Sequence, residues 1–405
     1  MMKKKIVGIL LTVVLVAVLV LSLVACGENN NTPEPEYTIV YVGDSIAEAL
    51  IGPSPLGERE NYGYHALVGR VNGFKYYNHS VSGHLTSGGM MGDDKDGLLE
   101  MLKRDDENAV QMKTHLQEAD MIHISILGNN MLQYNLGLLM YEVADPQFEA
   151  NYAEGTTLIN ALEDGSRDNP MYRDSLDDED EEVEFRFPSS YQNICDIVTR
   201  LKELNPTAKI VFQKVYNPFF EGSKHLSASA RAAIAKLTDD GRFGAKGEKI
   251  QSIEQLRKLA DYLLGKLNGM LDRYLAEHNG DEFIIVDAQA EFERVANMGI
   301  KDGKVDLSAT SLGASLIYPD WTHPSNFGHA VLAGLTQNML DELGVSSPNA
   351  VANYKAIKKD QINRLYAPVN GFNAALAIRA IDNAETFFDV TMVYFTVIDG
   401  YTPVY

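Results

Sequence analysis

The sequence has 405 residues, of which 45% are hydrophobic and 22% charged, so it encodes a globular protein with a sizeable core and not a disordered chain. A formal net charge of −21 argues against a nucleic-acid partner and weakly favours neutral or cationic substrates, although an acidic balance also simply aids solubility. Two cysteines, Cys26 and Cys195, are too few for a disulfide framework or a zinc ribbon, and Cys195 is expected to be a buried packing residue.

The first residues carry the features of a secretory signal at positions 1–25. Residues 3–5 are lysines, an uncharged apolar run covers 6–23, and Ala25-Cys26 follows it. A cysteine directly after small residues resembles the lipobox of bacterial lipoproteins, which implies cleavage before Cys26 and a lipid on it. An uncleaved transmembrane helix is the alternative. Either way, the polar tether at 26–36 and the rest of the chain are expected at the extracellular face of the cell membrane.

Apolar runs and helical periodicity alternate along the remaining chain. Buried parallel strands are predicted at 37–43, 74–81, 121–127, 209–215 and 283–287. Helices are predicted at 64–71, 96–117, 191–204, 253–278 and 326–343. This alternation predicts an α/β fold, a flavodoxin-like, doubly wound five-stranded parallel sheet within a domain at 37–345.

Two segments exceed a minimal sheet of this kind. Residues 133–190 form a long insertion, and its acidic loop at 174–184 is expected to be solvated. Calcium binding by this loop is the more specific alternative, but the loop lacks the spaced glycine of a calcium-binding loop. Residues 346–405 form a C-terminal extension with a predicted helix at 374–383 and a strand-like run at 387–397. The extension is expected to cover the sheet or to bind a partner.

Residues suited to chemistry follow the first three predicted strands. Gly43-Asp44-Ser45 ends the first, where glycine permits a tight turn and Ser45 is expected to open a helix. Gly83 follows the second strand and can offer an unobstructed backbone N–H. Asn129 and Asn130 follow the third, where a side-chain amide can donate to an oxyanion. Each fragment alone also fits a simpler role as a helix cap or turn former.

A fourth fragment, Asp320-Trp321-Thr322-His323-Pro324, precedes the last helix of the sheet domain. An aspartate three residues before a histidine can bond its Nδ1, which leaves Nε2 available as a base. Such a pair is often only structural, and two ligands do not make a zinc site. Because the exits of parallel strands converge on one edge of a sheet, the four fragments together predict the parts of an acyl-transfer site.

These fragments resemble the sequence blocks of the SGNH (GDSL-type) hydrolases. The resemblance implies the SGNH hydrolase fold, with Ser45 as nucleophile, His323 as base, Asp320 as its partner, and Ser45, Gly83 and an asparagine as oxyanion donors. Ile46 replaces the usual leucine after the serine. The third block departs from glycine–any–asparagine–aspartate: a gapless alignment puts Asn129 in the asparagine place, and a one-residue shift puts Asn130 there.

The expected function is that of an extracytoplasmic serine esterase, in particular a carbohydrate or cell-envelope O-acetyl esterase. A lipase or lysophospholipase is the enzymatic alternative. No metal and no organic cofactor are expected; the expected partners are an acetylated glycan or lipid substrate, and the cell membrane through a lipid on Cys26. A solute-binding or surface-interaction lipoprotein without catalysis is the alternative of another class, although one set of five strands argues against a two-lobed binding protein.

Overall fold

The computed structural model of this chain divides into residues 1–36 and a unit formed by residues 37–405. The residues described here are 37–51, 54, 56–87, 97–130, 190–218, 253–278, 283–298, 300–301, 304–305, 316–317 and 323–404. The signal, Cys26 and the tether lie outside them, as do most of the insertion and its acidic loop.

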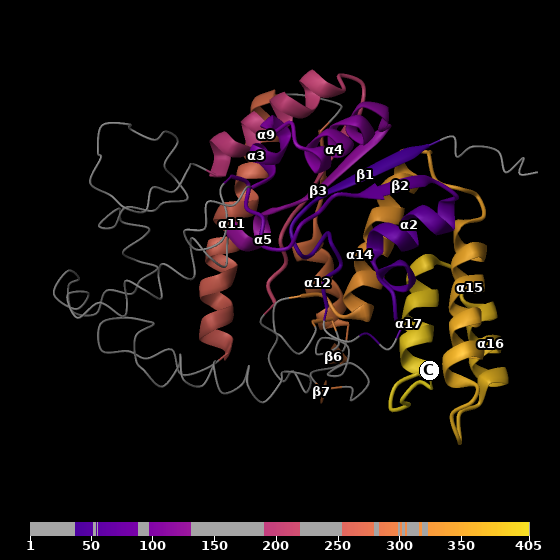
Figure 1. Cartoon of the computed structure of the whole chain (residues 1–405). Helices are drawn as coiled ribbons and strands as arrows, with labels where there is room; N and C mark the ends of the chain where they lie inside the picture. Colours follow the sequence, from indigo (N-terminus) through magenta and orange to yellow (C-terminus); the bar gives the residue numbers. More distant parts are fainter. Residues whose placement is uncertain are drawn as a thin grey trace, which may run out of the picture. The chain divides into compact units, whose positions relative to one another are not determined.

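A five-stranded parallel sheet forms the centre of the unit (Figure 1). Its strands are β1 (Thr38–Gly43), β2 (Lys75–Asn78), β3 (Met121–Ser125), β4 (Lys209–Gln213) and β5 (Phe283–Val286). The spatial order is β2-β1-β3-β4-β5 and every pairing is parallel, which confirms the predicted fold class. β1 begins one residue later than its predicted run and ends with it at Gly43, whereas the other four strands end before their runs do.

One face of the sheet packs against four helices. They are α3 (Leu98–Lys103), α4 (Glu107–Glu118), α9 (Ser190–Leu204) and α11 (Ile253–His278). The single helix predicted at 96–117 is two helices, because Asp106 accepts the N–H groups of Asn108 and Ala109 and so caps a new helix. Cys195 on α9 is half-buried and packs against this part of the core.

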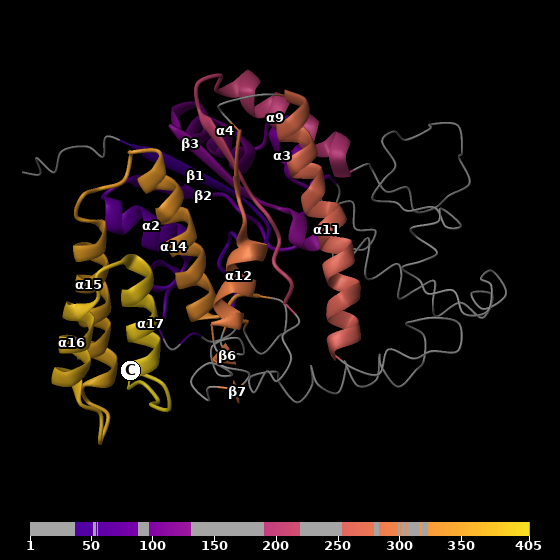
Figure 2. The same cartoon turned by 180° about the vertical axis from the view of Figure 1, so that it is seen from behind.

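The opposite face packs against α2 (Tyr64–Asn72), α12 (Ala288–Asn297) and α14 (Asn326–Glu342), as Figures 1 and 2 show from two sides. Adjacent residues of β1 point to different faces: Val40 and Val42 join the first cluster, whereas Ile39 and Tyr41 join the second. Burial on both faces explains why the strand reads as a continuous apolar run. The small strands β6 (Ile300–Lys301) and β7 (Lys304–Val305) form a separate antiparallel pair.

The C-terminal extension is a helical layer outside α2 and α14. It comprises α15 (Ala350–Gln361), the π-helix η5 (Ile362–Tyr366), α16 (Ala374–Asn383) and α17 (Phe387–Val397). Helix α15 lies against α2, and α17 lies against α14. The helix at 374–383 is confirmed, but the strand-like interpretation of 387–397 is wrong, because Phe387, Val390 and Tyr394 are buried at helical spacing.

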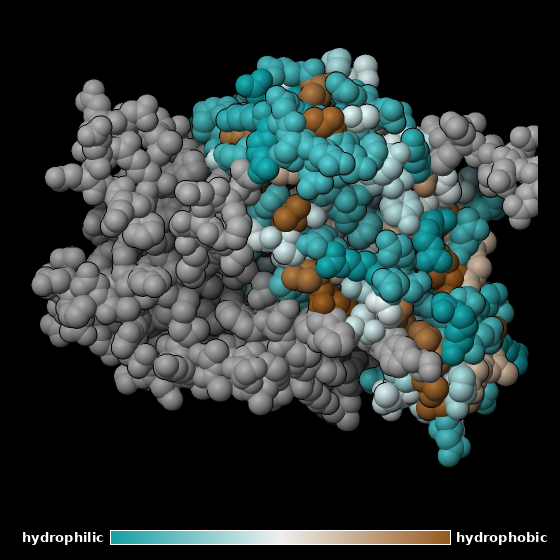
Figure 3. Space-filling model, in the orientation of Figure 1, coloured by the Kyte–Doolittle hydropathy of each residue, from teal (hydrophilic) through white to brown (hydrophobic). Residues whose placement is uncertain are grey.

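On the face drawn in Figure 3, the described surface is mainly hydrophilic, with small separate apolar patches. Among the described helices, none combines the length and the apolar character needed to cross a membrane.

Candidate active site

Ser45 lies in a tight turn that begins where β1 ends. Gly43 has a φ of 154°, and a Cβ there would lie 1.9 Å from the carbonyl oxygen of Ser125, so only glycine fits. The N–H of Leu50 donates to the carbonyl oxygen of Ser45 at 2.9 Å, and Ala49 takes a positive φ of 60°. This left-handed residue ends the turn at 45–49, so Ser45 opens a single turn and not the helix expected there.

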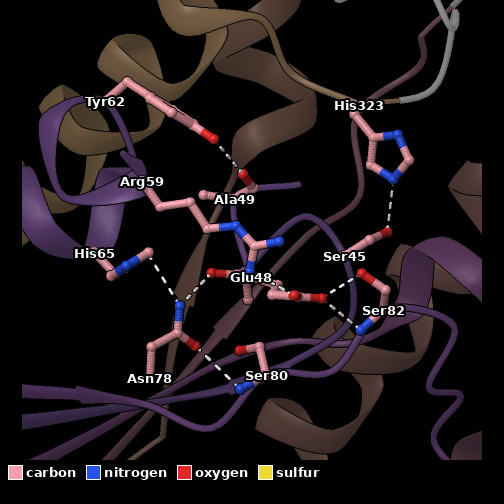
Figure 4. Close-up of polar contacts among 11 residues, drawn as sticks. Ser45, Glu48, Ala49, Arg59, Tyr62, His65, Asn78, Ser80, Ser82 and His323 are labelled. Carbon is pink, nitrogen blue, oxygen red and sulfur yellow. Dashed lines mark hydrogen bonds and ion pairs between the residues drawn. The ribbon is translucent and has the colours of Figure 1, made fainter. Parts of the chain in front are cut away.

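The side chain of His323 meets that of Ser45 across the site. Nε2 of His323 lies 2.8 Å from Oγ of Ser45, within hydrogen-bond distance (Figure 4). Ser45 is 7% exposed and His323 is half-buried, so the pair is largely screened from bulk water. The structure thus brings together two of the residues that the sequence selected as nucleophile and base.

The backbone beside His323 is fixed on both sides. Pro324 pairs with Ile317 in an isolated antiparallel bridge, and Ser325 caps α14 by accepting the N–H of Gly328 at 3.1 Å. These contacts explain how the histidine is held at the start of the helix. Asp320, the predicted partner of Nδ1, lies outside the described residues, so its role stays a prediction.

The carboxylate of Asp44 links the serine turn to the exit of β3. It accepts the N–H of Ile46 at 2.9 Å and the N–H of Gly128 at 3.1 Å. Asp44 is 1% exposed, and this burial raises the pKa of its carboxyl to about 6, against the opposing influence of the N–H of Ile46 and of His323. From the sequence, Asp44 is predicted only to cap a helix, because Gly128 lies 84 positions later in the chain.

Gly83 lies in a β-turn in the loop after β2. The N–H of His84 donates to the carbonyl oxygen of Val81 at 3.2 Å, and Gly83 has a φ of 87°. A positive φ at the third position is the mark of a type II turn and requires a glycine or asparagine. The N–H of Val81 donates to the carbonyl oxygen of Gly43 at 3.0 Å, which ties this turn to the end of β1.

Asn129 and Asn130 have different surroundings. The amide of Asn130 is 2% exposed; it accepts the N–H of Thr86 at 3.0 Å and donates to the hydroxyls of Thr86 at 2.8 Å and Ser190 at 3.2 Å. The Nδ2 of Asn129 donates to the carbonyl oxygen of His84 at 2.9 Å. Among the described residues Asn129 makes no second side-chain hydrogen bond, so one of its two N–H bonds remains available to a ligand.

Three loops and the segment before α14 therefore converge at the carboxyl ends of the strands. The arrangement brings a serine hydroxyl and a histidine nitrogen to hydrogen-bond distance, and hydrogen bonds tie the loops of Gly83 and Gly128 to the serine turn. A hydroxyl, an imidazole and N–H groups are the chemical groups that acyl transfer requires. Among the described residues, no group of three metal-ligating side chains is close enough together to hold a metal ion.

No family model and no curated protein matches the sequence. A lipase from a goat rumen metagenome has 14% identity and a TM-score of 0.39, covering 77% of this chain and 99% of that chain. An extracellular lipase from Streptomyces rimosus has 13% identity and a TM-score of 0.40, covering 77% and 100%. The chain is similar in structure to ester hydrolases.

A carbohydrate esterase of family 2 from Corynascus thermopiles, solved with a carbohydrate-binding domain, has 12% identity and a TM-score of 0.39, covering 78% of this chain and 68% of that chain. Likenesses at these identities and TM-scores are distant.

Proposed function

We propose that this protein is a serine ester hydrolase in which Ser45 is the nucleophile and His323 is the general base. The observation that carries the proposal is the 2.8 Å approach of Nε2 of His323 to Oγ of Ser45, two atoms whose residues are 278 positions apart. A serine hydroxyl within hydrogen-bond reach of a histidine is the arrangement that activates a nucleophile, and the carboxyl ends of parallel strands are where open α/β sheets bind ligands.

The reaction follows from the geometry. Oγ of Ser45 attacks the ester carbonyl carbon while its proton passes to Nε2 of His323. The carbonyl π electrons move to oxygen; as they return, the bond to the alcohol oxygen breaks and that oxygen takes the proton from Nε2. Water then attacks the acyl-serine, gives its proton to His323, and the acid leaves as Ser45 regains its hydroxyl proton.

Three donors are proposed for the developing oxyanion: the backbone N–H groups of Ser45 and Gly83 and the amide of Asn129. The support for Gly83 is its place in the turn that is tied to β1, and for Asn129 it is the N–H bond left over after the contact with His84. Such donors act strongest where water is excluded, as it is around a serine that is 7% exposed.

A fluorophosphonate probe and p-nitrophenyl acetate test the proposal. We expect the probe to label the wild-type protein and Ser347→Ala, a control in the segment after α14, but not Ser45→Ala. Hydrolysis by Ser45→Ala should fall by a factor on the order of 10⁴ or more. Full hydrolysis by Ser45→Ala would refute the mechanism, and an unlabelled wild-type protein would favour a solute-binding or surface-interaction protein without catalysis.

The substrate we propose is an acetyl ester on a carbohydrate or cell-envelope glycan. The net charge of −21 supports a neutral substrate over an anionic lipid surface. A series of p-nitrophenyl esters of increasing chain length tests this choice. A sharp maximum at acetate agrees with deacetylation, whereas a maximum at long chains would replace the proposal with a lipase or lysophospholipase.

We also propose that a lipid on Cys26 anchors the protein at the outer face of the cell membrane, with more than one acyl chain for stable attachment. The support is the basic start, the apolar run and the small residues before Cys26. Radioactive palmitate should label the protein, and the label should vanish in Cys26→Ala but remain in Cys195→Ala. Label retained by Cys26→Ala would contradict the anchor.

A further inference from the structure

Glu48 connects the two loops that carry Ser45 and Gly83. It lies in the turn after β1, three residues past the nucleophile. Its carboxylate accepts the N–H of Ser82 at 2.7 Å and also the hydroxyl of Ser82, as Figure 4 shows. The other carboxylate oxygen lies 2.5 Å from Nη1 of Arg59.

The residue that Glu48 binds directly precedes Gly83. Ser82 and Gly83 are the two central residues of the turn from Val81 to His84, and the peptide between them bears the N–H of Gly83. Glu48 binds the N–H of Ser82, which belongs to the preceding peptide, and also the hydroxyl of Ser82, so it holds in place the residue from which the Ser82–Gly83 peptide extends. The direction of the N–H of Gly83 therefore depends on a side chain of the serine turn.

The charge of Glu48 is balanced locally. A lone carboxylate close to a developing oxyanion would oppose the reaction by repulsion. The guanidinium of Arg59 offsets this charge through its 2.5 Å contact. Partial burial by itself raises the pKa of Glu48, but the hydrogen bonds from Ser82 and Arg59 outweigh this effect and hold the pKa below its usual range. The carboxylate of Glu48 therefore stays ionised at neutral pH.

We infer that Glu48 is a positioning residue for catalysis: it holds the Ser82–Gly83 peptide so that the N–H of Gly83 points at the oxyanion. The inference rests on the proposed function. Glu48 touches neither the nucleophile nor the base in the described contacts, and its effect should be felt where negative charge develops, in the transition state and not in substrate binding.

Three variants separate positioning from simple stabilisation. Glu48→Ala removes every bond to Ser82; Glu48→Gln keeps an oxygen that can accept the N–H of Ser82; Glu58→Gln, at an exposed position near Arg59, is the matched control. We expect kcat on p-nitrophenyl acetate to fall by about 10²-fold in Glu48→Ala and by about tenfold in Glu48→Gln, with KM changed by less than about threefold. Glu58→Gln should match the wild type.

A thionoester substrate gives a readout that loss of stability would not move. Sulfur is larger than oxygen and a weaker hydrogen-bond acceptor, so an aligned oxyanion hole discriminates against it. The ratio of kcat/KM for the ester to that for the thionoester should shrink by about tenfold in Glu48→Ala, because a misdirected N–H serves both substrates poorly.

Several outcomes would overturn the inference. They are an unchanged kcat in Glu48→Ala, an increase in KM alone, or an unchanged oxygen-to-sulfur ratio; Glu48→Gln provides the same readouts if the alanine variant fails to fold. Labelling of wild-type Ser45 by the fluorophosphonate probe distinguishes an error in the role of Glu48 from an error in the proposed function. If the wild type labels and Glu48→Ala turns over normally, only the role of Glu48 is lost.

Discussion

At the scale of single residues, the two asparagines after β3 should separate into one that acts on the substrate and one that supports the loop. Asn129→Ala should lower kcat on p-nitrophenyl acetate by about 10²–10³-fold, with little change in thermal stability. Asn130→Ala should cost about 1–3 kcal/mol of unfolding free energy, because the buried groups of Thr86 and Ser190 lose partners. Equal and small losses of kcat in both variants would remove both side chains from the oxyanion hole.

Lys358 on α15 makes stability depend on pH. The side chain is 1% exposed; its Nζ lies 4.5 Å from the ring centroid of Tyr394 and donates to the amide oxygen of Gln361 at 3.1 Å. Burial, and to a lesser extent the nearby charge of Arg70, lowers its pKa from 10.5 to about 7. Among the described residues no carboxylate pairs with this ammonium.

The sign of the effect follows from proton binding. Between pH 7 and 10.5 the unfolded chain holds a proton on Lys358 that the folded chain has lost, so the unfolding free energy rises with pH, by up to about 1.4 kcal/mol per unit. Lys358→Met should raise Tm at pH 7, and the difference in Tm between this variant and the wild type should shrink as the pH rises to 10. Exposed Lys103→Met is the control, and a constant difference between Lys358→Met and wild type over that range would contradict the prediction.

Single residues also show what the sequence reveals. Ser45 and His323 were recognisable because each stands in a short block of polar residues at an expected strand exit or helix start. The role of Glu48 was not recognisable, because the residues around it form no pattern that predicts a contact with Ser82, 34 positions later. Side chains that act through another loop are fixed by the tertiary fold, which local patterns do not encode.

At the scale of elements, the parallel strands were predictable and one helix was not. The central strands β1 and β3, which are buried on both faces, form continuous apolar runs, and all five strands lie within the runs predicted as strands. Helix α17 has a similar composition, FFDVTMVYFTV, rich in aromatic and β-branched residues that favour strands. A reciprocal capping box between Thr386 and Asp389 starts it as a helix, and packing against α14 decides the outcome.

The same local logic explains the other departures. Asp287, the last residue of the strand predicted at 283–287, caps α12 by accepting the N–H of Ala290 at 2.9 Å. Asp106 divides a predicted long helix in two. In both cases a single aspartate starts a new helix inside a segment that the apolar pattern assigns to one element. The aspartate does so because its carboxylate accepts backbone N–H groups of the first helical turn that otherwise lack a partner.

At the scale of the whole molecule, the C-terminal extension supports the serine turn directly. Leu365 and Tyr366 of η5 share an apolar cluster with Ala49 and Tyr62. The hydroxyl of Tyr62 donates to the carbonyl oxygen of Ala49 at 3.1 Å, and Ala49 lies four residues past Ser45. This extension is thus packed into the structure that holds the site, although its sequence carries no recognisable motif.

A shortened chain tests this support. Residues 37–345 produced without the extension should be unstable or insoluble and should not hydrolyse p-nitrophenyl acetate, because α2 and α14 would expose the apolar side chains that the extension covers. Within the full chain, Leu365→Ala should cost about 2–5 kcal/mol of unfolding free energy. A truncated protein with the Tm and kcat of the full chain would show that the extension is dispensable for folding and catalysis.

The long separation between Ser45 and His323 also determines when chemistry becomes possible. Synthesis must pass His323 before the hydroxyl of Ser45 can meet the imidazole, so a product of translation stalled earlier than this histidine lacks the pair. If the proposed hydrolysis holds, such a shortened product should be inert toward esters, because closing this long loop is a late event in folding.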